Sequence, residues 1–281
     1  MGEWVLEMNA VYHATYSCTV DRKGTELITR CALISTDYEA SAQLAVDIYN
    51  FKINHVGWDI YRTPAGYTLI SQDIPELNGV EAYFYSGSQI RQTVGQAMNG
   101  IPLELITECI RGIGQAEAFI IKERGFSSPE QFDEYCCEIG IDSCYYYSNL
   151  DLLEMPWSEY MGEHSYARDK DLFYRHKNYT IFSQPDNSLL TTASFVDTFH
   201  EIAMVTTLNE QGLITECSGS FMRSPDKICY KTLELLSQLK GQNLSAASKK
   251  EIAGWLGGSL GCTHLYEMAC DLGKTLADFQ K

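Results

Sequence analysis

The sequence is short of basic residues and of long apolar runs. It contains 21 Lys and Arg against 37 Asp and Glu, which gives a formal net charge of -16 at pH 7. A chain this acidic repels phosphate backbones and anionic lipid surfaces, so we expect neither nucleic acid nor a membrane as a partner. No apolar stretch reaches the about 18 residues that span a bilayer. The remaining candidates are a protein partner and a small-molecule substrate.

The chain also lacks an export signal at its start. The opening MGEWVLEMNAVYH has no basic segment followed by an apolar run, and Leu6 stands where a myristoylation signal has Ser or Thr. We therefore expect a cytoplasmic location. Because the cytosol keeps thiols reduced, the ten cysteines are not expected to form a disulfide scaffold.

Two stretches of the chain resemble each other. Residues 35–64 and residues 196–225 align without a gap, and they end in RTP and RSP. Each stretch gives two strand-like runs around a short turn, Tyr49-Asn50 in the first copy and residues 209–212 in the second, which predicts a β-hairpin in both. A strand-like run precedes each hairpin. The sequence therefore predicts an α+β tandem repeat of two small units, each an antiparallel three-stranded sheet packed with helices.

The length supports two domains, because single cores rarely exceed about 250 residues. After the second hairpin, we expect a helix that begins at Ser224 and ends at Gly241. The expected division is a first unit at residues 1–124, a helical and aromatic connector at residues 125–171, and a second unit at residues 172–281.

The second copy carries residues suited to a metal ion. Cys229 lies in the first turns of one expected helix, and Cys262 begins another, with His264 two residues on. The partial positive charge of a helix N-terminus lowers a cysteine pKa, so we expect both thiols to favour the thiolate that binds metal. Two sulfurs and an imidazole suit zinc, iron or an iron–sulfur species.

A fourth ligand is expected from the beginning of the second hairpin. Its spacing leaves three alternatives open, namely Asp197, His200 and Glu201. The first copy lacks soft ligands at all matching places, where it has Ser88, Gln115 and Glu117 in place of the two cysteines and the histidine. We therefore expect only the second copy to hold an ion.

The remaining cysteines have simpler interpretations. An isolated cysteine is usually a small hydrophobic core residue, and this is expected for Cys18, Cys31, Cys109, Cys217 and Cys270. A local group at Cys136, Cys137 and Cys144 has no accompanying histidine or CxxC pattern. A second metal site there is therefore the less favoured interpretation.

The ending LGGSLGCTHLYEMACDLGKTLADFQ resembles a bacterial family of unknown function whose members show a GGxxGCTHLxEL motif after an earlier Pro-x-x-x-Cys, here Pro225 to Cys229. This similarity covers residues 197–280. The order of strand, hairpin, cysteine helix and second cysteine helix is also similar to the U-type iron–sulfur cluster scaffolds of the IscU or NifU N-terminal type. That resemblance implies a SufE/NifU-like fold.

The scaffold resemblance also implies roles for individual residues. Cys229 and Cys262 match the second and third scaffold cysteines, and His264 stands near the scaffold histidine. Asp197, His200 or Glu201 falls where the first cysteine and the aspartate sit. The first cysteine itself is missing, so a single zinc or iron ion fits the remaining ligands better than a labile cluster does.

These observations predict a metal-binding protein with an iron–sulfur-scaffold-like C-terminal domain. The alternative is a metal-dependent enzyme that acts on a small molecule through an open coordination position, with His200 or Glu201 as general base. A third interpretation is a structural zinc site, which needs four closed protein ligands. The oligomeric state stays open, with a homodimer among the possibilities.

Overall fold

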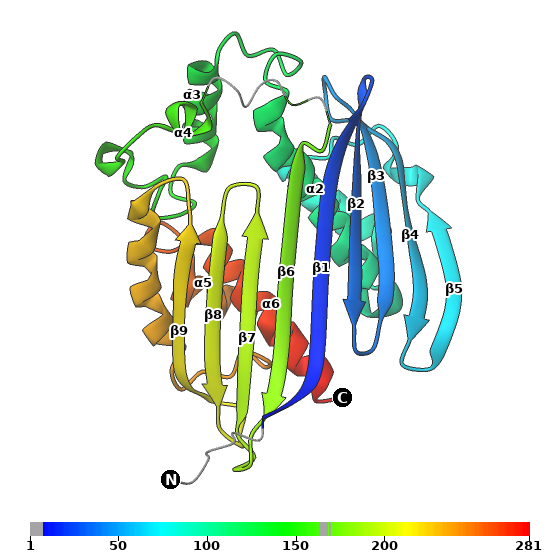
Figure 1. The fold of residues 1–281 in the computed structure, drawn as a ribbon. Helices are drawn as coiled ribbons and strands as arrows, with labels where there is room; N and C mark the ends of the chain where they lie inside the picture. The colour runs from blue at the N-terminus through cyan, green and yellow to red at the C-terminus, as the bar shows by residue number, and fades with distance from the viewer. Residues whose placement is uncertain (1–7, 163–167, 169) are drawn as a thin grey trace. The chain divides into compact units, whose positions relative to one another are not determined.

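The computed structural model describes residues 8–162, 168 and 170–281. The described residues contain nine strands, which form one sheet in the order β5-β4-β3-β2-β1-β6-β7-β8-β9 (Figure 1). Their bounds are β1 (Asn9–Lys23), β2 (Glu26–Ser35), β3 (Glu39–Asp47), β4 (Ile53–Thr63), β5 (Gly66–Asp73), β6 (Phe173–Ser183), β7 (Leu189–Asp197), β8 (Glu201–Leu208) and β9 (Ile214–Arg223).

Helices follow the strands in both halves of the sequence. The α-helices are α1 (Gly87–Val94), α2 (Ile101–Ala116), α3 (Pro129–Gly140), α4 (Trp157–Met161), α5 (Lys249–Leu256) and α6 (Thr263–Phe279). The 3-10 helices are η1 (Pro75–Leu77), η2 (Phe84–Ser86), η3 (Ala97–Gly100), η4 (Glu117–Phe119), η5 (Leu150–Leu152) and η7 (Lys227–Leu239). Among the described residues, no helix has the length and apolar character to cross a membrane.

The expected tandem repeat of small three-stranded units with a SufE/NifU-like fold is wrong. All nine strands belong to one sheet, and the strand pairs β2–β3, β3–β4, β4–β5, β7–β8 and β8–β9 are antiparallel. The sequence interpretation missed β1, β5 and β6. The long strands β1 and β6 are neighbours in the sheet, so strands from both halves of the sequence join one sheet instead of closing two small ones.

Both predicted hairpins are confirmed. β3 pairs with β4 and β8 pairs with β9, each as antiparallel neighbours. In the second hairpin, Asn209 Oδ1 accepts hydrogen bonds from the backbone N–H groups of Gln211 and Leu213, and Gly212 takes a φ of 74°. Asparagine and glycine thus form the turn as their backbone preferences predict.

The chain separates into two compact units, each made of discontinuous segments. Unit 1 contains Met1–Ala14, Cys136–Pro156 and Lys177–Lys281, and unit 2 contains Thr15–Tyr135 and Trp157–His176. In unit 2, α2 packs on β2, β3 and β4. Cys18, Cys31 and Cys109 are buried there, as expected for core cysteines.

In unit 1, α6 packs against β7, while η7 packs along β9. The apolar stripe of α6 is buried at Leu265, Met268, Leu272 and Leu276. The helix after the second hairpin begins later than predicted, because the N-cap is Asp226, whose side chain accepts a hydrogen bond from the backbone N–H of Ile228 at 2.8 Å.

Candidate metal centre

The corner between β7 and β8 is held by the carboxylate of Asp197. Its Oδ1 accepts hydrogen bonds from the backbone N–H groups of Phe199 at 2.8 Å and His200 at 2.6 Å. The Arg223 guanidinium donates to the carbonyls of Asp197, Thr198 and His200 at 2.6, 2.7 and 3.2 Å. An aspartate that accepts from the amides just after it forms a local turn. The corner is therefore fixed by side chains of its own unit.

The corner between β2 and β3 has the same construction with different side chains. Ser35 Oγ accepts from the backbone N–H groups of Asp37 at 3.3 Å and Tyr38 at 2.9 Å. Arg62 donates to the carbonyls of Thr36 at 2.6 Å and Tyr38 at 3.3 Å. The arginines of the RTP and RSP endings are therefore structural. At this second corner, a serine and a tyrosine replace the aspartate and the histidine.

The turn that precedes α6 places His264. A Cβ atom at Gly261 would overlap the carbonyl oxygen of Leu256, so only glycine fits this position. The backbone N–H of Cys262 donates to the same oxygen at 2.7 Å. Cys262 is the N-cap of α6, and His264 lies in the first turn of that helix.

A buried ion group fixes α6 against the sheet. Lys177 on β6 is 1% exposed, and its Nζ lies 2.9 Å from Glu267 Oε1 and 2.7 Å from Asp271 Oδ2. The hydroxyl of Tyr179 donates to Asp271 Oδ2 at 3.0 Å. His264, Glu267 and Asp271 follow one face of the helix at the spacing i, i+3, i+7. The same helix face thus carries the candidate ligand and its anchor.

Asp197, His200 and His264 come together as one group. One ligand atom from each residue lies within 4.8 Å of the other two. The rings of His200 and His264 are 4.0 Å apart between centroids, and His200 Nδ1 lies 3.1 Å from Asp197 Oδ1. Asp197 and His200 are 3% and 9% exposed. The structure thus gathers residues more than sixty positions apart in the sequence.

These separations agree with those of ligands around a tetrahedral ion. Metal–nitrogen and metal–oxygen bonds of about 2.0–2.1 Å at tetrahedral angles put donor atoms about 3.3 Å apart. The 3.1 Å between Asp197 Oδ1 and His200 Nδ1 is close to that value, and it is also the length of a hydrogen bond between the two side chains. For the group as a whole, no two of the three ligand atoms are more than 4.8 Å apart.

Cys262 lies beside this group. Its Sγ is 3.9 Å from His264 Nδ1, and a sulfur and a nitrogen bound to one zinc ion are about 3.6 Å apart. Cys262 is 6% exposed. Burial raises the pKa of the Cys262 thiol to about 11. A metal ion bound here would therefore have to displace a proton that the thiol holds firmly.

Cys229 lies in the first turn of η7 rather than in an α-helix. Burial, and to a smaller extent the nearby thiols of Cys262 and Cys144, raise the pKa of its thiol to about 12. The expectation that the helix starts favour thiolate at Cys229 and Cys262 is therefore wrong. Desolvation outweighs the partial charge of the helix end at both positions.

Glu201 begins β8 and is paired in register with Val196 and Arg223. It does not belong to the group of ligand atoms that lie within 4.8 Å of one another. Of the three alternatives for the hard ligand, the structure brings Asp197 and His200 next to His264.

In the first copy, Ser88, Gln115 and Glu117 stand at the positions that match the two cysteines and the histidine. Ser88 and Gln115 lie on α1 and α2. Glu117 is 1% exposed, accepts a hydrogen bond from the hydroxyl of Tyr83 at 2.6 Å and pairs with Arg124 at 2.7 Å. Within the part of unit 2 that the structure describes, no three potential ligands form a group of this kind.

Cys144 is close enough to raise the pKa of the Cys229 and Cys262 thiols, although sequence reasoning did not assign it to the site. The backbone N–H of Tyr145 donates to the carbonyl of Gly261 at 2.7 Å, which ties the connector to the turn before α6. Lys231 Nζ lies 5.7 Å from the centroid of the Tyr145 ring. No spacing pattern links residue 144 to Cys229 or Cys262, so the sequence contained no signal for this electrostatic effect.

Comparison with known proteins places the candidate ligands within one family match. Residues 184–278 match the model of a family described as a protein of unknown function, DUF2889. This stretch includes Asp197, His200, Cys229, Cys262 and His264, whereas Cys144 lies outside it. No curated protein matches the chain, and no solved structure does.

Proposed function

We propose that this chain binds one transition-metal ion through Asp197, His200 and His264. The observation that carries the proposal is the convergence of their ligand atoms within 4.8 Å of one another. Two imidazoles and a carboxylate favour zinc or iron(II) over magnesium and calcium, which prefer all-oxygen sites. The sulfur of Cys262, 3.9 Å from His264 Nδ1, adds a soft donor and strengthens that preference.

Metal binding is the function that we place first. An iron–sulfur scaffold activity, as the sequence resemblance implies, stays a prediction, and the nine-stranded sheet lends it no support. The second candidate is a metal-dependent enzyme. It is favoured by the number of grouped ligands, because the three ligands of the group leave a position for water or a substrate if the Cys262 sulfur does not bind the ion.

The test is metal analysis of the full chain purified without oxygen, followed by zinc titration of the stripped protein. The wild type is expected to bind one ion. His200→Ala and His264→Ala each remove a ligand, so zinc affinity should fall by more than the roughly 10- to 100-fold that loss of an outer hydrogen-bond partner causes.

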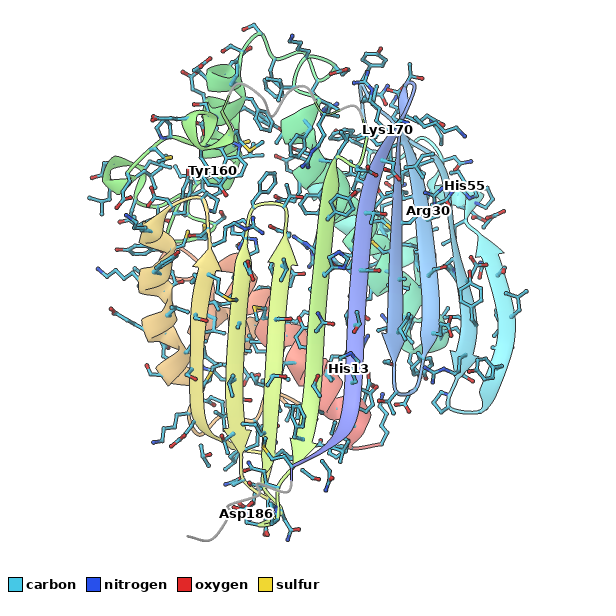
Figure 2. The ribbon with its side chains drawn as sticks, viewed as in Figure 1. His13, Arg30, His55, Tyr160, Lys170 and Asp186 are labelled. Atoms are coloured by element: carbon cyan, nitrogen blue, oxygen red, sulfur yellow. The ribbon has the colours of Figure 1, made fainter. Side chains whose placement is uncertain are left out.

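His55→Ala is the matched control, because His55 is an exposed histidine on β4 (Figure 2). It should leave zinc affinity unchanged. The proposal fails if the wild type binds no ion, or if both site variants keep the wild-type affinity. The absorption spectrum of the cobalt(II) form separates the two candidates. Adding a small anion will change the spectrum of a site with an open position, whereas it will leave the spectrum of a closed four-ligand site unchanged.

A further inference from the structure

The segment Cys136–Pro156 of unit 1 reverses the usual division between surface and interior. Tyr146 is buried, whereas Ile141 and Leu152 are 68% and 58% exposed. The other exposed large apolar side chains of the segment are those of Ile139, Leu150 and Met155. Single exposed apolar residues are common on protein surfaces, but a group of them marks a surface at which a partner binds.

These apolar residues belong to one folded part of the chain, residues 138–155, which we call the connector surface. It begins in the last turns of α3 (Figure 1). A Cβ atom at Gly140 would lie 2.8 Å from the ring of Tyr147, so the end of α3 packs against that ring. The hydroxyl of Ser148 donates to Asp142 Oδ1 at 3.4 Å. These contacts bring residues 139–142 beside the chain that leads into η5.

The connector surface is anchored to the rest of unit 1 at two places. The backbone N–H of Tyr145 donates to the carbonyl of Gly261 at 2.7 Å. The backbone N–H of Glu154 donates to Asp226 Oδ2 at 2.7 Å, and Asp226 is also the N-cap of η7. A surface that is fixed before binding loses little conformational entropy when a partner docks on it.

The charge of the connector surface is of one sign. Residues 138–155 contain no lysine and no arginine, and their acidic residues, all exposed, are Glu138, Asp142, Asp151 and Glu154. Each acidic residue stands next to one of the exposed apolar residues in the sequence, as Asp151 does between Leu150 and Leu152. Glu154 also pairs with Lys227, whose Nζ lies 3.0 Å from its Oε2. Apolar and negative groups therefore alternate along the surface.

We propose that the connector surface binds a partner protein through a segment that combines basic and apolar side chains. Charge complementarity selects this occupant, because lysine or arginine of the partner would meet the carboxylates while its apolar residues cover the isoleucines and leucines. A second copy of this chain would bring the same acidic surface, and an anionic lipid headgroup would be repelled in the same way. The proposal does not depend on metal binding.

The test is fluorescence anisotropy of labelled synthetic peptides titrated with the full chain. An amphipathic peptide of leucine and lysine is expected to bind, and to bind more weakly as the salt concentration rises. A lysine–serine peptide of equal charge lacks the apolar side chains, and a leucine–glutamate peptide has the wrong charge. Each should bind roughly 10-fold more weakly or worse.

Two substitutions on η5 locate the binding. Leu152→Ser removes an exposed apolar side chain, and Asp151→Lys replaces a negative charge by a positive one. Each should weaken binding of the leucine–lysine peptide roughly 10-fold, because the first loses buried apolar area and the second brings like charges together.

Leu69→Ser and Glu76→Lys are the matched controls. Leu69 is a leucine of β5 that is 70% exposed, and Glu76 is an exposed glutamate of η1, so they repeat the two changes in apolar area and net charge elsewhere in the chain. Both should keep the wild-type affinity. A wild type that does not bind the leucine–lysine peptide overturns the proposal. So does equal binding of the lysine–serine peptide, or η5 variants that bind as tightly as their controls.

Discussion

The corners at Asp197 and Ser35 differ in one side chain, and that side chain decides whether the corner can offer a metal ligand. Both accept hydrogen bonds from the amides two and three residues on, and an arginine holds the surrounding carbonyls in both corners. Serine satisfies the backbone as aspartate does, but a neutral hydroxyl is a poor metal ligand. The corner and the candidate metal centre are therefore separable by a single substitution.

Asp197→Ser tests this separation. Because the hydroxyl can keep the backbone hydrogen bonds, the free energy of unfolding should fall by no more than about 1–2 kcal/mol. Zinc affinity should fall by more than roughly 10-fold, since a ligand is lost. Urea unfolding and zinc titration measure the two quantities. Zinc affinity equal to wild type would show that the carboxylate serves the corner alone.

The pH dependence of zinc affinity tests whether the sulfur of Cys262 is a ligand. Its pKa of about 11 means that the thiol is protonated at neutral pH and must release a proton when it binds metal. Affinity should therefore rise with pH, by about ten-fold per unit for this one proton. Cys262→Ser should lower the affinity and remove that part of the slope. Cys217→Ser is the control, and an unchanged slope in Cys262→Ser would exclude the sulfur as a ligand.

Among the elements, the two hairpins and α6 followed from the sequence, whereas β6 did not. The residues of β6 that face the interior include Arg175 and Lys177, which are 4% and 1% exposed. Their charges are balanced by Glu108 for Arg175 and by Glu267 and Asp271 for Lys177. A pattern that looks for apolar residues on the buried face cannot find such a strand, because its partners lie far away in the sequence.

The candidate site was likewise predicted in part. His264 stood out because of its motif, and the hairpin start supplied Asp197 and His200 as alternatives. The structure brings both next to His264, which spacing alone could not show. The cysteine pKa values could not be predicted, because they depend on how deeply each thiol is buried after folding.

The turn before α6 allows a prediction about an element. A methyl group at Gly261 would collide with the carbonyls of Leu256 and Gly257, so Gly261→Ala should displace the start of α6 and His264 with it. Stability and zinc affinity should both fall. Gly254→Ala is the matched control, because nothing lies within 4 Å of its added Cβ and alanine favours the helix interior. If Gly261→Ala binds zinc as tightly as the wild type, the turn does not position the site.

At the scale of the molecule, unit 1 cannot be isolated as one continuous segment. A fragment of residues 172–281 carries all three grouped ligands but lacks β1 and Tyr145, which donates to Gly261. We expect this fragment to aggregate or to unfold at lower urea concentration, and to bind zinc more weakly than the full chain. Sedimentation, urea unfolding and zinc titration test this. A monomeric fragment with full-length affinity would show that the remainder of unit 1 is dispensable.

The discontinuity of unit 1 also sets an order of events during synthesis. β1 contributes residues to unit 1 up to Ala14, yet its sheet neighbour β6 leaves the ribosome only after about 160 further residues. At roughly 5–20 residues per second, that interval lasts about 10–30 s. During this time the β6 side of β1 is an unpaired strand edge in the growing chain. Folding of unit 1 is therefore governed by long-range pairing and is expected to be slow, with a transient need for chaperones.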